Sequence, residues 1–127
     1  MNFGGMPVTN RIPLLLIPGL VSTRLMWEAQ IQGLADIADC WVTPLPAYDD
    51  LEKMAREILA NAPEKFAVAG HSLGGYLCFE LFRLAPHRIL QMGLFSTTCD
   101  PETAQVSQRR AVMNEDAEKQ GFLAMIR

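Results

Sequence analysis

The chain has 127 residues, half of them hydrophobic, and a formal net charge of −3. This length and composition suit one globular domain with a buried core and exclude a disordered chain. The small acidic excess and the scattered basic residues argue against nucleic acid or an anionic membrane as a partner.

The first part of the chain predicts strands that alternate with helices. Residues 1–11 show no periodicity and form a lead-in, whereas the apolar run 14–17 between prolines is typical of a strand buried on both faces of a parallel sheet. A helix follows, capped by Ser22 or Thr23, and its apolar residues recur at helical spacing: Trp27, Ile31, Leu34, Ala35 and Ala38. A short strand is expected at 40–43, before Pro44 and Pro46.

The middle of the chain continues this alternation. Asp49-Asp50 opens a helix with one apolar stripe, and Asn61-Ala62-Pro63 closes it. A strand at 66–69, a largely apolar helix at 73–85 and a strand at 89–95 follow, with Pro86 breaking the chain before the last strand. Strands and helices in this order predict an α/β fold, with a parallel sheet of about four strands and helices on both faces.

The strand at 66–69 leads directly into the sequence Gly-x-Ser-x-Gly, formed by Gly70, Ser72 and Gly74. This spacing suits a nucleophile elbow, in which a strand turns sharply into a helix and holds the serine at the apex in a strained conformation. The glycines allow the neighbouring backbone to come close. We expect the hydroxyl of Ser72 above the sheet edge and the N–H of Leu73 pointing to where an oxyanion would form.

These residues resemble the α/β-hydrolase superfamily, and Gly-His-Ser-Leu-Gly-Gly is similar to the motif of its ester-hydrolase-like members. The resemblance extends from about residue 12 to residue 95. It implies that Ser72 is the nucleophile and that the loop after the first strand supplies a second oxyanion donor, for which the N–H of Leu20 is the candidate. The superfamily usually has His-Gly in this loop, whereas this chain has Pro18-Gly19, which also fits a plain strand-ending turn.

A serine nucleophile needs a base, and the superfamily supplies its triad in the order Ser, then Asp or Glu, then His. His71 is adjacent to Ser72 and diverges from it at a sharp turn, and His87 follows the far end of the next helix, about 20 Å away at about 1.5 Å per residue. The histidine is therefore expected downstream of residue 127, which makes this chain the front half of a hydrolase. Asp100 is a candidate acid, although Asp100-Pro101 also makes an ordinary helix start.

The composition becomes polar and charged after residue 99. The resemblance implies that residues 1–99 form an incomplete α/β-hydrolase core and that residues 100–127 begin a helical cap, with a helix from Glu102 to Gln120. An ordinary surface helix that ends the fold is the alternative.

The cysteines and the apolar runs bear on location. Cys40, Cys78 and Cys99 have no metal-ligand spacing, so we expect no metal site, and their odd number favours a reducing, cytoplasmic compartment. No apolar run approaches the roughly 18 residues of a membrane span, so no membrane partner is expected.

The leading interpretation is a serine hydrolase that acts on a small-molecule ester or related acyl substrate without a cofactor. Because the triad acid and histidine are expected beyond residue 127, the chain alone should be inactive. The alternative is a non-catalytic truncated module that binds a small molecule or a partner chain. The strand at 89–95 carries no charged residue, and an open, uncharged edge favours self-association.

Overall fold

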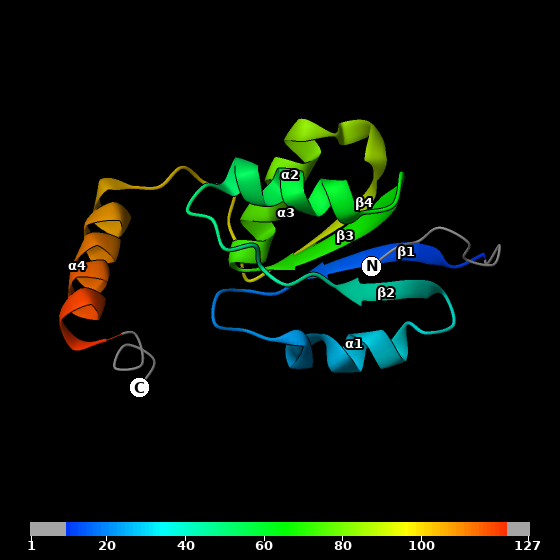
Figure 1. The fold of residues 1–127 in the computed structure, drawn as a ribbon, viewed down its shortest axis with the longest axis horizontal. Coiled ribbons are helices and arrows are strands. Elements are labelled where there is room, and N and C mark those ends of the chain that lie inside the picture. Colours follow the sequence, from blue (N-terminus) through cyan, green and yellow to red (C-terminus); the bar gives the residue numbers. More distant parts are fainter. Residues whose placement is uncertain (1–9, 122–127) are drawn as a thin grey trace.

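Four parallel strands form the centre of the structure, a computed structural model that describes residues 10–121 (Figure 1). The strands lie in the order β2-β1-β3-β4, so that β1 and β3 are the inner pair. In chain order the elements are β1 (Ile12–Ile17), a 3₁₀ turn η1 (Arg24–Trp27), α1 (Glu28–Gly33), β2 (Ala38–Val42), α2 (Leu51–Asn61), β3 (Phe66–His71), α3 (Leu73–Leu84), η2 (Pro86–Arg88), β4 (Ile89–Phe95) and α4 (Ala104–Gln120). The predicted fold class is confirmed.

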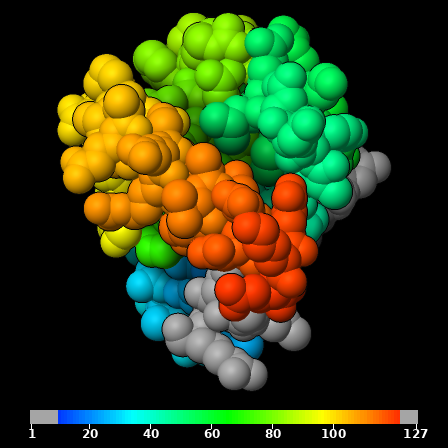
Figure 2. All heavy atoms as spheres, turned by 90° about the vertical axis from the view of Figure 1, so that its left-hand side faces the viewer, coloured from blue at the N-terminus to red at the C-terminus, as the bar shows by residue number. Residues whose placement is uncertain are grey.

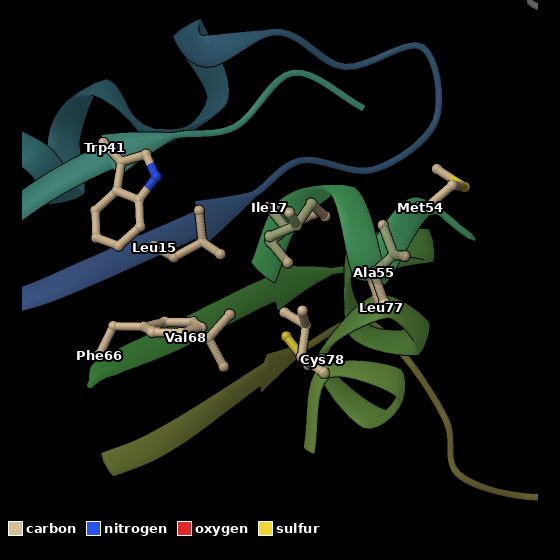
Figure 3. Close-up of a cluster of buried hydrophobic side chains, with 11 residues drawn as sticks. Leu15, Ile17, Trp41, Met54, Ala55, Phe66, Val68, Leu77 and Cys78 are labelled. Carbon is tan, nitrogen blue, oxygen red and sulfur yellow. The ribbon is translucent and has the colours of Figure 1, made fainter. Parts of the chain in front are cut away.

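Helices α2 and α3 cover one face of the sheet. Alternate residues of β1 and β3 point to this face, because successive side chains of a strand point to opposite sides. They pack with the apolar stripes of the two helices into the larger core cluster (Figure 3), which contains Leu15, Ile17, Trp41, Met54, Ala55, Ile58, Phe66, Val68, Leu77, Cys78 and Leu81. Burying each large side chain of this kind stabilises the fold by about 1.5–3 kcal/mol.

Helix α1 covers the opposite face, where Trp27 packs with Leu16 and Ala69. The prediction for this region was partly wrong, since the helix ends at Gly33 and Ala38 begins β2. Ala38 is paired in parallel with Ile12 of β1 and is buried there. Pairing with a buried strand outweighs helical spacing, which is a weak local preference. Thr23 is confirmed as a cap, although the element that it caps is the 3₁₀ turn.

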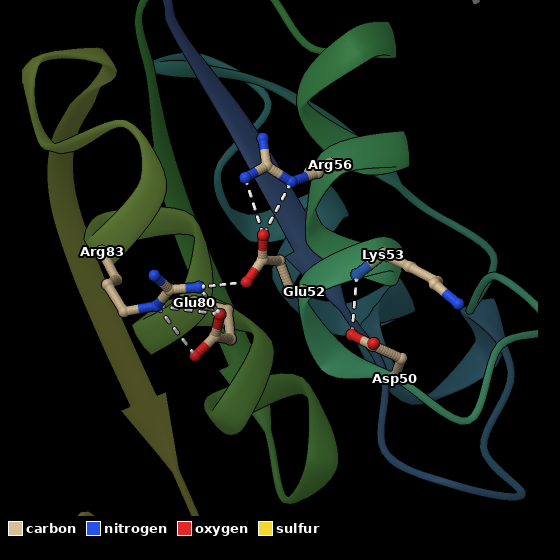
Figure 4. Close-up of polar contacts among 6 residues, drawn as sticks. All are labelled: Asp50, Glu52, Lys53, Arg56, Glu80 and Arg83. Carbon is tan, nitrogen blue, oxygen red and sulfur yellow. Dashed lines mark hydrogen bonds and ion pairs between the residues drawn. The ribbon is translucent and has the colours of Figure 1, made fainter.

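A polar network joins the outer surfaces of α2 and α3 (Figure 4). Asp50 caps α2 through its Oδ1, which accepts from the backbone N–H of Lys53 at 3.1 Å. Glu52 accepts from Arg56 of its own helix at 2.7 Å and from Arg83 of α3 at 2.9 Å. These groups are solvated, so water and salt screen each pair and it contributes little to stability.

Arg88 ties the end of α2 to the start of β4. Its guanidinium lies 5.8 Å from the centroid of the Phe66 ring and donates to four backbone carbonyls. The acceptors are the carbonyls of Leu59, Ala62, Pro63 and Glu64. One half-buried cation thereby satisfies carbonyls at the end of a helix, which lack intrahelical partners.

Helix α4 stands beyond the carboxyl-terminal ends of the strands (Figure 1) and lies across that side of the molecule (Figure 2). None of its described residues is buried. It is linked to the rest of the chain through Arg110, which pairs with Glu102 at 2.8 Å and donates to the hydroxyl of Tyr76 in α3 at 3.4 Å. Within residues 10–121, no helix is long and apolar enough to cross a membrane.

Candidate active site

Ser72 occupies the single residue between β3 and α3. Its backbone has φ 53° and ψ −114°, and it is one of three non-glycine residues with positive φ in the part of the chain that the structure describes. Such a conformation costs on the order of 1–3 kcal/mol and persists only where the surroundings hold it in place. The predicted strand-turn-helix is therefore present, with the serine at its apex.

The predicted elbow glycines stand where the backbone is most crowded. A Cβ on Gly70 would overlap the backbone of Gly74 and come within 2.7 Å of the Cys78 Sγ. A Cβ on Gly74 would overlap the carbonyl of Ile17 and lie 3.0 Å from the carbonyl oxygen of Pro18. Helix α3 can therefore approach the ends of β1 and β3 only because both positions lack side chains.

The backbone of Ser72 is held at both ends by hydrogen bonds. Its N–H donates to the carbonyl of Phe95 at 3.0 Å, and its carbonyl accepts from the N–H of Gly75 at 2.9 Å and from the hydroxyl of Thr97 at 3.0 Å. Phe95 and Thr97 were not among the predicted site residues. Their place at and just after the end of β4 indicates this sheet edge, because neighbouring parallel strands end at the same edge, but it does not say which residue meets Ser72.

Of the two predicted oxyanion donors, Leu73 directly follows Ser72 and Leu20 belongs to the loop after β1. Leu73 is the first residue of α3, and the first N–H groups of a helix have no acceptor within it and carry partial positive charge. A Cβ on Gly19 would lie 3.3 Å from the Cβ of Ser72, so the loop after β1 packs directly against the serine. Leu20 follows in that loop, which is closed by a bond from Ser22 N–H to the Gly19 carbonyl at 3.1 Å.

The residues considered as base and acid are not joined to Ser72 by a hydrogen bond in the described part of the chain. The Nδ1 of His71 is buried and lies 2.8 Å from where a Gly19 Cβ would stand, so this ring packs against the loop after β1. His87 is exposed in η2. Asp100 is exposed, and its carboxylate accepts from the hydroxyl of Thr98 at 3.1 Å.

Cys78 lies beneath the elbow, fully buried in the core cluster. Burial raises the pKa of its thiol to about 12, because the thiolate would lose its hydration. The side chain therefore packs as a small apolar group and offers no second nucleophile. Within residues 10–121, no group of three or more His, Cys, Asp or Glu is arranged to hold a metal ion.

A parallel sheet whose inner strand turns through a strained serine into a helix is typical of the α/β-hydrolase fold.

No protein-family model matches the chain. A pimeloyl-(acyl-carrier protein) methyl ester esterase of Vibrio campbellii is 30% identical over 87 residues, which are 62% of this chain and 34% of that protein. A protein of the same description from Nitrosomonas europaea is 27% identical over 93 residues, 67% of this chain and 37% of that protein.

Solved structures of hydrolases share the fold of this chain. A thermophilic esterase from Thermogutta terrifontis has a TM-score of 0.69 at 24% identity, over 88% of this chain and 46% of that chain. An enol-lactonase from Burkholderia xenovorans has a TM-score of 0.73 at 21% identity, over 95% of this chain and 50% of that chain. The chain is thus related to the α/β-hydrolase superfamily and to ester hydrolases within it. It spans about a third of the length of these curated relatives and about half of these structures.

Proposed function

We propose that this chain carries the nucleophile of a serine hydrolase and that Ser72 attacks the carbonyl carbon of an ester or related acyl substrate. The observation that carries the proposal is the backbone of Ser72, at φ 53° and ψ −114° between β3 and α3. Strain of this kind is retained where it serves a function. The Oγ of Ser72 would bond to the acyl carbon, its proton would pass through a base to the departing alcohol, and water would then release the acid.

The oxyanion that forms during this attack needs hydrogen-bond donors on one side of the serine. The N–H groups of Leu73 and Leu20 are the proposed donors, supported by the helix start at Leu73 and by the contact between Gly19 and Ser72. Each donor of this type contributes about 10²–10³ in kcat.

The base and the acid of the triad are proposed to come from sequence that follows residue 127 in the whole protein. The order Ser, Asp or Glu, His supports this, as does the lack of a hydrogen bond from His71 or His87 to Ser72 in the described residues. Asp100 stays a candidate acid. Reading the gene beyond the codon for Arg127 tests the idea directly, since an in-frame Asp and His are expected about 70–130 residues further on.

Helix α4 is proposed to begin a cap over the site, with residues 1–99 as the incomplete core and residues 100–127 as the start of the cap. Its place beyond the carboxyl ends of the strands supports this assignment (Figures 1 and 2); residues 122–127 lie outside the described part. The cap would supply the walls of the substrate pocket.

The names of the curated relatives favour an acyl methyl ester as the substrate class. The three cysteines, all of them free, favour a cytoplasmic location.

The hydrolase proposal is tested with p-nitrophenyl acetate and the Ser72→Ala variant. For the whole protein, turnover should depend on Ser72. For the 127-residue chain, we expect Ser72-dependent turnover well below about 1 per second, because losing the base costs about 10⁶ in kcat. Ser72-dependent turnover above that rate by the chain would contradict the missing base. Turnover by the whole protein that Ser72→Ala leaves unchanged would contradict the nucleophile.

A non-catalytic module that pairs with another chain is the second candidate, favoured by β4. This strand has one neighbour in the described sheet, carries no charge, and exposes Leu90, Leu94 and Phe95. An open apolar edge is a template for strand pairing. The 127-residue chain should therefore self-associate, which light scattering at about 100 μM would detect. A stable monomer would reject this pairing and would point to coverage of the edge from within the chain.

A further inference from the structure

We propose that Thr97 is a positioning residue whose hydroxyl sets the direction of the Leu73 N–H, a role that rests on the proposed function of Ser72. The contact on which this depends is the bond from the Thr97 Oγ1 to the carbonyl oxygen of Ser72, at 3.0 Å. Thr97 is half-buried, and it comes two residues after the end of β4. It contacts Ser72 through the backbone carbonyl.

The link from Thr97 to the oxyanion donor is the peptide group between Ser72 and Leu73. A peptide group is planar and trans, so its carbonyl and its N–H point in opposite directions and turn together. Fixing the Ser72 carbonyl therefore fixes the direction of the Leu73 N–H. A carbonyl that accepts hydrogen bonds also polarises its own peptide group, which makes the N–H a stronger donor.

This peptide group needs such a restraint because ψ of Ser72 is −114° at a φ of 53°. The N–H of Gly75 also bonds to the carbonyl, at 2.9 Å, but it belongs to the same helix turn and moves with it. The N–H of Ser72 donates to the Phe95 carbonyl and fixes the other side of the residue. Thr97 thus provides the side-chain contact that holds this carbonyl from outside α3, in the segment after β4.

The packing around Thr97 is shaped for this contact. A Cβ on Gly75 would lie 2.5 Å from the Oγ1 and the Cγ2 of Thr97, so the threonine occupies the space that a side chain would fill. Ser96, with φ 48°, bends the chain just after β4, directly before Thr97. The missing side chain at Gly75 and the positive φ of Ser96 therefore both help to place the Thr97 hydroxyl.

The test compares Thr97→Val, which keeps the branched shape and removes the hydroxyl, with Thr97→Ser, which keeps the hydroxyl. Thr43→Val is the matched control, because the Thr43 hydroxyl also donates to a backbone carbonyl, that of Pro44 at 3.1 Å, at the end of β2. In the 127-residue chain, at a concentration where light scattering shows a monomer, nuclear magnetic resonance should show the Ser72 carbonyl carbon and the Leu73 amide shifted by Thr97→Val, and close to their parent positions in Thr97→Ser and Thr43→Val. Unchanged resonances in Thr97→Val would overturn the proposal.

Kinetics then separate positioning from general support of the fold. In the whole protein, Thr97→Val should lower kcat for p-nitrophenyl acetate by about tenfold at unchanged KM, less than the loss of a whole oxyanion donor because Gly75 still bonds the carbonyl. Thr97→Ser should restore most of the rate. An unchanged kcat alongside shifted resonances would also overturn the role of Thr97. If Ser72→Ala leaves turnover intact, the hydrolase proposal fails instead, and the resonances alone decide whether Thr97 orients the peptide.

Discussion

Replacing Gly74 by alanine tests the close approach on which the elbow depends. A methyl group at this position would overlap the carbonyl of Ile17 and lie 3.0 Å from the Pro18 carbonyl oxygen. Both contacts are backbone atoms at the buried end of β1, so no side-chain rotation can relieve them. Helix α3 would have to move away from the sheet by about 1 Å, since van der Waals contacts of carbon and oxygen need more than 3 Å.

The cost follows from what α3 buries. Its side chains Leu77, Cys78 and Leu81 are fully buried, and a gap of 0.5–1 Å forfeits about a quarter to a half of the dispersion energy of such contacts. Overpacking strain adds about 1–3 kcal/mol, while replacing a helical glycine by alanine returns about 1 kcal/mol. We therefore expect Gly74→Ala to destabilise the fold by about 2 kcal/mol, and Gly74→Val by more, because its methyl groups need further room.

Urea unfolding at 25 °C measures this directly, and Gly33→Ala is the control. A Cβ on Gly33 would meet nothing within 4 Å, so that variant should unfold within about 0.5 kcal/mol of the parent or slightly later. With a slope of about 2 kcal/mol per M, Gly74→Ala should lower the midpoint by about 1 M. A Gly74→Ala midpoint that coincides with the parent would refute the reasoning.

Three further predictions concern the strain, the fold and the thiols. Ser72→Gly should raise the urea midpoint of the chain by the equivalent of about 1 kcal/mol, because glycine adopts a positive φ freely. In the whole protein it should abolish the proposed ester hydrolysis. A midpoint below that of the parent would contradict stored strain at Ser72. Arg88→Ala should destabilise the fold by about 2 kcal/mol through the loss of a charged donor to four carbonyls, and Arg88→Lys should recover only part of this stability. Urea midpoints of Arg88→Ala and the parent that coincide would contradict this prediction. Burial raises the pKa of Cys78 to about 12, so at pH 8 this residue stays a thiol. It should react with a disulfide reagent only after unfolding, or as the pH approaches that pKa, whereas exposed Cys99 should react at once. Rapid labelling of Cys78 in the native protein would contradict this prediction.

Most of the fold could be predicted from the sequence because its local signals agree with its long-range packing. The strand at 89–95 and the helix that begins after Asp50 match the structure at their ends, since Pro86 precedes the strand and Asp50 caps the helix. Ala38 was assigned wrongly because its spacing from Leu34 fits a helix equally well. Only its pairing with Ile12 in the folded sheet decides between the two.

The site could be predicted only where it is local. Ser72, Gly70 and Gly74 stand together in the sequence and could be recognised as an elbow. Thr97 could not, because its contact with Ser72 depends on how β4 is aligned with β3. That register shifts between Phe66 and Val68, where one extra residue of β4 is accommodated, and counting along the chain gives no sign of the shift.

The restraints on Ser72 come from three separate stretches of chain: the loop at Gly19, the first turn of α3 and the end of β4. The shortest stretch of sequence that contains all three ends at Thr97. The next element, α4, starts only at Ala104, and the exposed residues 98–103 between them make no hydrogen bond to residues 70–75. This segment is therefore a favourable point at which to divide the protein into two fragments. A chain cut there would keep all three restraints on Ser72 in one fragment, and binding of the second fragment would report on the return of α4.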